Sequence, residues 1–266
     1  MSAGLALVTG ASSGIGRELA RNAAKDRFDV VLVARRRERM QELADELSAR
    51  YGVTVEIVAA DLAAPGSAKA VFTAASARTG SVDVLVNNAG LGVHGLFAET
   101  PLERELETIR VNVLALTELT KYCVPGMIER GRGRILNVAS TASFQPGPLM
   151  AVYYATKAYV LSFTEALAEE LTGTGVTATA LCPGPTLTEF QERAGFGDVP
   201  LFRGPLVWDA ASVARVGWDG AKRGKHVVIP GFANRVLALG ARLSPRRLST
   251  KIARRLQEKR KVEGNA

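Results

Sequence analysis

The chain has 266 residues, 47% of them apolar and 23% charged, which is the ordinary balance of a globular protein. No apolar run approaches the ~20 residues that a membrane-spanning helix needs, and the first residues lack the basic segment of a signal peptide, so we expect a cytoplasmic protein with free, buried thiols at Cys123 and Cys182. Residues 235–266 hold ten basic and two acidic side chains, a difference of +8 that equals the net charge of the whole chain, so the basic character belongs to this end alone.

Seven short runs rich in β-branched residues alternate with helical stretches along the chain. The predicted strands are Leu5–Thr9, Asp29–Ala34, 54–59, Val84–Asn87, 134–139, 176–182 and 226–229, and the predicted helices cover 18–25, 39–51, 66–79, 101–129, 152–171 and 209–222. Strands that are apolar throughout, each followed by a helix, are typical of a parallel sheet with right-handed crossovers. The sequence therefore predicts a doubly wound α/β fold with a seven-stranded parallel sheet and helices on both faces.

The glycine-rich segment TGASSGIG, residues 9–16, lies between the first predicted strand and the first helix. Gly10 permits a tight turn, Gly14 lets the backbone approach a pyrophosphate, and Gly16 lets the helix pack close to the sheet. The free N–H groups at the start of the helix attract phosphate, and the lack of a Gly-Lys-Ser/Thr sequence argues against a nucleotide-hydrolysing P-loop. We predict a dinucleotide site here; the alternative is a glycine-rich turn without a ligand.

Three consecutive arginines, Arg35, Arg36 and Arg37, follow the second predicted strand. An NAD site carries an acidic residue at about this distance from the glycine loop, where it binds the ribose 2′-hydroxyl. A guanidinium group suits a phosphate instead, and a bound anion would offset the unfavourable placement of positive charge at a helix start. The run predicts NADP(H), with Arg35 and Arg36 near the 2′-phosphate; the alternative is a solvated basic helix start.

The segment AVYYATK, residues 151–157, places a lysine within one helical turn of two adjacent tyrosines. A tyrosine beside a lysine can act as a proton donor near neutral pH. On this ground alone, either Tyr153 or Tyr154 could pair with Lys157.

The chain resembles the short-chain dehydrogenase/reductase family, in its compact NADP(H)-dependent branch, over roughly residues 4–231. The resemblance rests on motifs in a fixed order, namely TGASSGIG at 9–16, Asp61, NNAG at 87–90, Asn112, Ser140, the tyrosine–lysine pair and PGPTLT at 183–188. In the family pattern the active serine precedes the tyrosine by thirteen residues, which selects Tyr153 and leaves Tyr154 to face the core or a subunit interface. The resemblance implies a single Rossmann-type catalytic domain over 1–231 that binds cofactor and substrate, followed by a basic amphipathic extension over 232–266.

The resemblance also implies an oxidoreductase that transfers a hydride between NADP(H) and a carbonyl compound or secondary alcohol. Tyr153 acts as the acid and base, Ser140 polarises the carbonyl oxygen, Lys157 holds the ribose hydroxyls, and Asn112 holds a water that relays protons to Lys157. No metal is expected. The implied cofactor contacts are Gly10, Ser12, Ser13, Gly14, Ile15, Gly16, Arg35, Arg36, Asp61, Leu62, Asn88, Ala89, Gly90, Tyr153, Lys157, Pro183, Gly184, Thr186 and Thr188. A free tyrosine has a pKa of ~10, so Lys157 and the positive nicotinamide ring are expected to lower it by ~3 units.

The segment 186–208 is expected to form a lid over the substrate. Its aromatic residues Phe190, Phe196, Phe202 and Trp208, with Phe144 and Met150 beside the catalytic residues, favour an apolar ketone or aldehyde, unless they only pack the lid. His94 either touches the substrate or is a packing or surface residue. A second hypothesis is an NADP(H)-binding regulator or sensor with little turnover, although neither Tyr153 nor Lys157 is lost.

The C-terminal residues 235–260 are predicted to form two short helices divided at Pro245. Leu239 and Leu243 are four apart, as are Leu248, Ile252 and Leu256, which gives each helix an apolar stripe among basic residues. This pattern predicts contact with an anionic membrane surface. The alternative, which needs no further partner, is that the stripe packs on a neighbouring subunit or over the substrate cleft. Nucleic-acid binding is not expected, and a homodimer or homotetramer is expected through the helices at 101–129 and 152–171.

Overall fold

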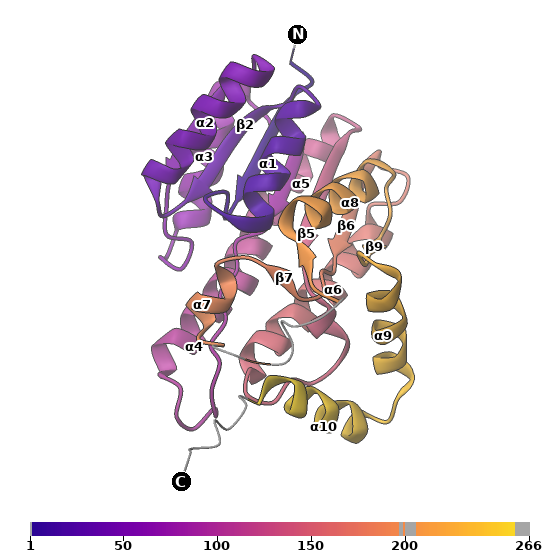
Figure 1. Cartoon of the computed structure of the whole chain (residues 1–266). Coiled ribbons are helices and arrows are strands. Elements are labelled where there is room, and N and C mark those ends of the chain that lie inside the picture. The colour runs from indigo at the N-terminus through magenta and orange to yellow at the C-terminus, as the bar shows by residue number, and fades with distance from the viewer. Residues whose placement is uncertain (1, 197–198, 200–205, 259–266) are drawn as a thin grey trace.

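A parallel sheet of seven strands runs through the centre of the molecule (Figure 1). The structure is a computed structural model that describes residues 2–196, 199 and 206–258. The strands lie in the order β3-β2-β1-β4-β5-β6-β9, each parallel to its neighbours. Their bounds are β1 Leu5–Thr9, β2 Asp29–Ala34, β3 Val55–Ala59, β4 Val84–Asn87, β5 Gly133–Val138, β6 Val176–Leu181 and β9 Val227–Val228. The predicted fold and sheet are confirmed.

Helices cover both faces of this sheet, and each face has its own apolar core. Side chains at alternate positions of β1 point to opposite cores, Ala6 and Val8 to one and Leu5 and Leu7 to the other. Because both faces are buried, the strand is apolar throughout, as the sequence indicated. The first core is covered by α1 (Gly14–Lys25), α2 (Arg37–Tyr51) and α8 (Ala210–Lys222), and the second by α3 (Ser67–Thr79), α5 (Leu116–Glu129) and α6 (Ala151–Glu170).

The stretch 101–129, predicted as one helix, is divided. It comprises α4 (Leu102–Ile109), a π-helical segment η1 (Arg110–Ala115) and α5. A π-helical turn carries one more residue per hydrogen-bonded ring than an α-helix and is frequent at functional sites. Asn112 lies in this segment.

The predicted lid contains secondary structure that the sequence did not indicate. Two short strands, β7 (Thr186–Leu187) and β8 (Trp208–Asp209), pair in parallel, and α7 (Phe190–Ala194) follows β7. The pair ties the start of the lid to its end. Phe202, one of the predicted lid residues, lies outside the described residues.

The C-terminal segment forms two helices divided at Pro245, as predicted, namely α9 (Phe232–Leu243) and α10 (Arg246–Gln257). Figure 1 shows α9 running down one side of the molecule and α10 turning beneath it. The stripe residues Leu248 and Ile252 are 51% and 47% exposed, while Ser249, Ala253 and Gln257 on the opposite face of α10 are buried. No helix in the described part of the chain is long and apolar enough to cross a bilayer.

Candidate active site

A cavity of about 420 Å³ opens at the carboxyl ends of the strands, where doubly wound folds bind their ligands. Every predicted cofactor residue except Gly16 lines it. Gly16 lies behind the cavity wall, where a Cβ would come within 2.3 Å of Asn88 Nδ2 and 2.4 Å of the Gly10 carbonyl oxygen. This agrees with its predicted role, which is to let the helix pack closely.

The loop after β1 presents backbone N–H groups to this cavity. The loop turns at Gly10, which has φ of 67°, and α1 begins at Gly14, so the first turn of the helix borders the cavity. Ser13 at the N-cap makes no side-chain capping hydrogen bond, which leaves the first N–H groups for an anion. Asn88 fixes the loop from the neighbouring strand, since its Nδ2 donates to the Thr9 carbonyl oxygen at 3.0 Å.

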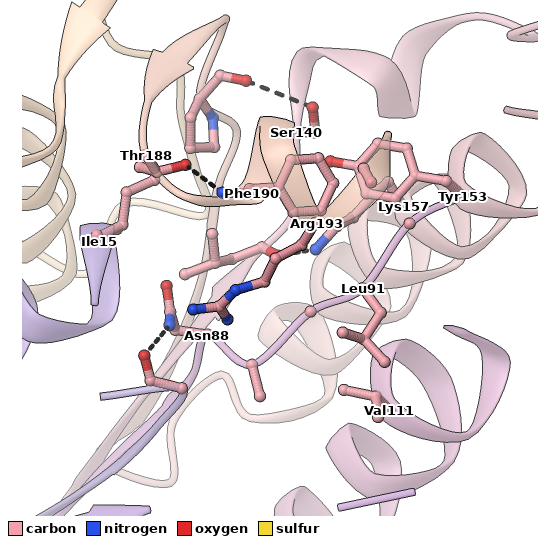
Figure 2. Close-up of a pocket in the computed structure, with 18 of the residues that line it drawn as sticks. Ile15, Asn88, Leu91, Val111, Ser140, Tyr153, Lys157, Thr188, Phe190 and Arg193 are labelled. Carbon is pink, nitrogen blue, oxygen red and sulfur yellow. Dashed lines mark hydrogen bonds between the residues drawn. The ribbon is translucent and has the colours of Figure 1, made fainter. Parts of the chain in front are cut away.

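Ser140, Tyr153 and Lys157 converge on the same cavity from two elements (Figure 2). Ser140 follows β5, and its hydroxyl accepts a hydrogen bond from the Ala142 N–H at 3.1 Å and is hydrogen-bonded to the Tyr153 side chain. Lys157 lies one turn after Tyr153 on α6, and its Nζ donates to the Val138 carbonyl oxygen at 2.8 Å. The serine, the tyrosine and the lysine that the family spacing selected are therefore brought together.

The pKa values in this group differ from the sequence-based expectation. Burial raises the pKa of Tyr153 to about 12, and the hydrogen bond with Ser140 offsets only part of this rise. Burial also lowers the pKa of Lys157 to about 8. The protein's own groups therefore do not lower the pKa of the tyrosine, because burial is the largest cause of the shift. The Nζ of Lys157 lies 5.8 Å from the centre of the tyrosine ring.

Asn112 lies behind the cavity and is almost fully buried. Its side-chain amide forms two hydrogen bonds with the backbone of Leu91: Oδ1 accepts from the N–H at 2.9 Å, and Nδ2 donates to the carbonyl oxygen at 2.9 Å. Nδ2 also donates to Thr156 Oγ1 at 3.0 Å. The side chain therefore joins the loop after β4 to α6 beside Lys157. Its role in a proton relay stays a prediction.

Tyr154, predicted to face either the core or a subunit interface, is buried within the single chain. Its ring is 7% exposed and packs over Gly147, where a Cβ would meet the ring at 2.3 Å. The hydroxyl accepts a hydrogen bond from Gln257 Nε2 at 2.8 Å. Tyr154 therefore contacts the C-terminal helix, whereas Tyr153 contacts Ser140.

Arg36 is the better placed of the two arginines predicted near the 2′-phosphate. Its guanidinium donates to Ser12 Oγ in the glycine loop at 3.1 Å and pairs with Glu189 at 2.9 Å. Arg35 pairs with Glu107 at 3.1 Å instead. Arg39 also donates a hydrogen bond to Glu189. Burial by itself would raise the pKa of the Glu189 carboxyl group, but the hydrogen bonds from Arg39 and Arg36 lower it overall. Glu189 was not predicted, because it lies in the lid, far from the arginines in sequence.

The aromatic residues predicted for the lid divide into two groups. Phe190 and Phe196 line the cavity, and the Phe190 ring lies 5.3 Å from the Tyr153 ring (Figure 2). Phe144 and Trp208 do not line it. His94 lies against Phe196, with ring centres 5.2 Å apart, and its Nε2 is 2.9 Å from the Gln257 carbonyl oxygen, so it packs against the lid and the C-terminal helix.

Two further residues of the cavity were missed by the sequence analysis. Ala253 and Leu256, both on α10, line the same cavity as Tyr153. Sequence reasoning assigned this segment to an extension outside the catalytic domain, and the boundary at residue 231 stays a prediction. The spacing of Ala253 from the catalytic residues carries no local signal that would have indicated the contact.

Comparison with known proteins agrees with this geometry. Residues 4–196 match the model of the short chain dehydrogenase family. The chain is 38% identical to "Ketoacyl reductase HetN" of Nostoc sp. over 67% of its own length and 62% of that protein, which is less than two thirds of the relative. It also resembles the solved structure of a short-chain dehydrogenase from Sphingobium yanoikuyae in complex with NADPH, with a TM-score of 0.80, 36% identity and coverage of 90% of this chain and 93% of that one.

A second solved structure is similar over nearly the same length. It is the "bulky-bulky ketone specific alcohol dehydrogenase" from Comamonas testosteroni, with a TM-score of 0.75, 32% identity and coverage of 89% of this chain and 90% of that one. The family model covers well over half of the chain, and the ordered motifs meet at one cavity. The chain therefore belongs to the short-chain dehydrogenase family.

Proposed function

We propose that this protein is an NADP(H)-dependent oxidoreductase that reduces a ketone or aldehyde to an alcohol. The observation that carries the proposal is the meeting of Ser140, Tyr153 and Lys157 in the cavity that the glycine loop borders. A relative described as a ketoacyl reductase and similar structures described as an NADPH complex and a ketone-specific alcohol dehydrogenase support it.

The residues present fit a dinucleotide with a 2′-phosphate. The open N–H groups at the start of α1 suit the pyrophosphate, and Arg36 suits the 2′-phosphate. Gly90 leaves room above Lys157, since a Cβ there would come to 3.5 Å from Lys157 Nζ and would narrow the cavity. When bound, the cofactor supplies the hydride that the carbonyl carbon receives.

The chain's own residues then control the proton. The Tyr153 hydroxyl, with its pKa raised to about 12 by burial, keeps its proton at neutral pH and gives it to the carbonyl oxygen as negative charge develops there. Ser140 donates a hydrogen bond to the same oxygen. Lys157, fixed by the Val138 carbonyl group, stabilises the tyrosinate that is left. The alternative, a cofactor-binding sensor, is not favoured, because all the groups for turnover are present.

The proposal can be tested with purified protein, NADPH and a series of ketones and aldehydes of increasing size. We expect loss of the reduced nicotinamide absorbance only when a carbonyl compound is added, and the reverse change with NADP⁺ and the matching alcohols. A protein that binds NADPH but shows neither reaction with any compound would contradict the reductase and favour the sensor. The apolar residues Phe190 and Phe196 support a preference for apolar substrates.

We further propose that the protein is cytoplasmic. In the cytoplasm it docks on anionic membranes through α9 and α10. Residues 232–257 carry seven exposed arginines and lysines and no acidic residue, and a second copy docked on the same face would meet like charge. Exposed large apolar side chains lie among them, and such helices bind at the interface of anionic bilayers. These side chains are Phe232, Val236, Leu237, Leu239, Leu243, Leu248, Ile252 and Leu256.

Co-sedimentation with vesicles tests this docking. The protein is expected to pellet with phosphatidylserine vesicles at low salt and to remain in solution with phosphatidylcholine alone. Replacing Arg242, Arg246 and Arg247 together by Glu is expected to abolish the binding without changing the melting temperature, since all three are exposed. Equal sedimentation of the wild-type protein with both lipids, or with neither, would exclude an electrostatic membrane contact.

The homo-oligomer is proposed to form through the α5 and α6 side of the molecule. Leu114 on η1, Ile128 on α5 and Tyr159 on α6 are large apolar side chains that are exposed in the single chain. Light scattering at micromolar concentration is expected to give a multiple of the 28.2 kDa chain mass. Replacing Leu114 and Tyr159 by Arg is expected to shift the mass toward the monomer, and a wild-type protein that is already monomeric would contradict the interface.

A further inference from the structure

The end of the cavity beyond Tyr153 has walls from three separate parts of the chain. They come from α6, from the lid and from the C-terminal helix α10. The lid also contributes Arg193 to the lining of the cavity. Apart from Arg193 and the Tyr154 hydroxyl, the side chains in these walls are apolar, so they suit a carbon-rich group rather than a charged one. They belong to Met150, Tyr154, Phe190, Ala194, Phe196, Ala253 and Leu256.

One buried residue holds α10 against this end of the cavity. Gln257 is fully buried, its Nε2 donates to the Tyr154 hydroxyl at 2.8 Å, and its main-chain carbonyl oxygen lies 2.9 Å from His94 Nε2. Tyr154 is the neighbour of the catalytic tyrosine, and His94 follows the NNAG motif. The last turn of α10 is therefore fixed directly to the active site and not to a distant surface.

The inward face of α10 is made of residues that allow a close approach. Ser249 and Ala253 are small and buried, and Ser249 lies against α9, with its Oγ 3.5 Å from the Ala241 carbonyl oxygen. Leu256 lines the cavity and is also 40% exposed, so it marks the place where the cavity meets the outer surface. A long apolar group bound at Tyr153 would leave the cavity beside Leu256.

We propose that α10 is the outer wall of the substrate site and that Gln257 is the positioning residue that holds it there. The substrate class that follows is a ketone or aldehyde whose carbonyl carbon carries an extended apolar group. The inference rests on the proposed reductase function and adds to it the segment that selects the substrate.

The test compares 2-undecanone, which is long, with 2-butanone, which is short. In the wild-type enzyme kcat/KM is expected to be at least a hundredfold higher for 2-undecanone. Ala253→Leu fills the cavity, and Gln257→Leu removes the hydrogen bond to Tyr154 with a side chain of similar size. In both variants the ratio of the two kcat/KM values is expected to fall at least tenfold, because KM rises more for 2-undecanone than for 2-butanone.

Ala233→Leu is the matched control, because it makes the same change at an exposed position of α9 and should leave the ratio as in the wild type. An unchanged ratio in both Ala253→Leu and Gln257→Leu would overturn the inference. Calorimetric titration of 2-undecanone into the NADP⁺ complex gives a readout that needs no turnover. In one outcome, the wild-type protein binds this ketone at least tenfold more tightly than Ala253→Leu and yet reduces neither ketone. That result would support α10 as the outer wall of the substrate site and would contradict the proposed reductase reaction.

Discussion

Replacing Tyr153 by Phe is expected to lower kcat by about 10³-fold, within the range of ~10²–10⁴ that a positioned general acid contributes. The change removes one hydroxyl group, which hydrogen-bonds Ser140 and is the proposed proton donor. The ring remains to pack against Phe190, so the fold and the Kd for NADPH should be preserved. Steady-state kinetics with a reducible ketone, together with a fluorescence titration of NADPH, measures both quantities.

Tyr154→Phe is the control, since it makes the same chemical change at the next residue. This hydroxyl bonds Gln257 on α10 and not Ser140, so kcat should stay within a few-fold of the wild-type value. Any loss should appear in KM for long apolar ketones, because α10 is held less firmly. An inactive Tyr154→Phe beside an active Tyr153→Phe would show that the other tyrosine is the acid.

Replacing Arg36 by Asp is expected to reverse the cofactor preference from NADPH to NADH. A charge-assisted contact with a phosphate contributes about 1.5–3 kcal/mol, so its loss alone lowers NADPH affinity by tenfold or more. The new carboxylate repels the 2′-phosphate and can accept a hydrogen bond from the 2′-hydroxyl of NADH. The two Kd values, measured by quenching of tryptophan fluorescence, should show a combined change in their ratio of about a hundredfold.

Arg37→Asp provides the matched control for this charge reversal. Arg37 is exposed at the start of α2, next in sequence to Arg36, but it does not line the cavity. If general electrostatics of the basic run set the preference, both variants would change it alike. If Arg36→Asp and the wild type have the same ratio of Kd values, Arg36 does not bind the 2′-phosphate.

The fold and the cofactor end of the cavity could be predicted because their signals are local. Strands buried on both faces appear as continuous apolar runs, and parallel strands bring their following loops to one edge, so motifs far apart in sequence meet there. The two-residue strands β7 and β8 are too short to show any periodicity. The rise in the pKa of Tyr153 in the protein alone could not be predicted, since the neighbour in sequence was visible but the extent of burial was not, and the lowering expected with the nicotinamide ring bound stays a prediction.

The C-terminal helix shows a different limit of sequence reasoning. Apolar side chains at helical spacing indicated a stripe of Leu248, Ile252 and Leu256. This stripe was predicted to contact a membrane, with packing on the protein as the alternative. The face of α10 that packs on the protein carries Ser249, which lies against α9, and Ala253 and Gln257, which lie at the active site. Small residues allow this close contact, and the amide of Gln257 bonds the Tyr154 hydroxyl. Similarly, the pairing of Glu189 with Arg36 and Arg39 depends on how the lid folds back, which no short motif records.

The position of α10 has a consequence for how this enzyme can change over evolution or be redesigned. The glycine loop, Ser140 and Tyr153 lie within residues 4–196, which match the family model, while Ala253 and Leu256 lie well after that range in the chain. Substitutions on α10 can therefore alter which compound is accepted without touching the sheet, the proton donor or the cofactor site. Libraries of variants at the exposed positions of α10 around Leu256 would therefore be the place to sample new substrates.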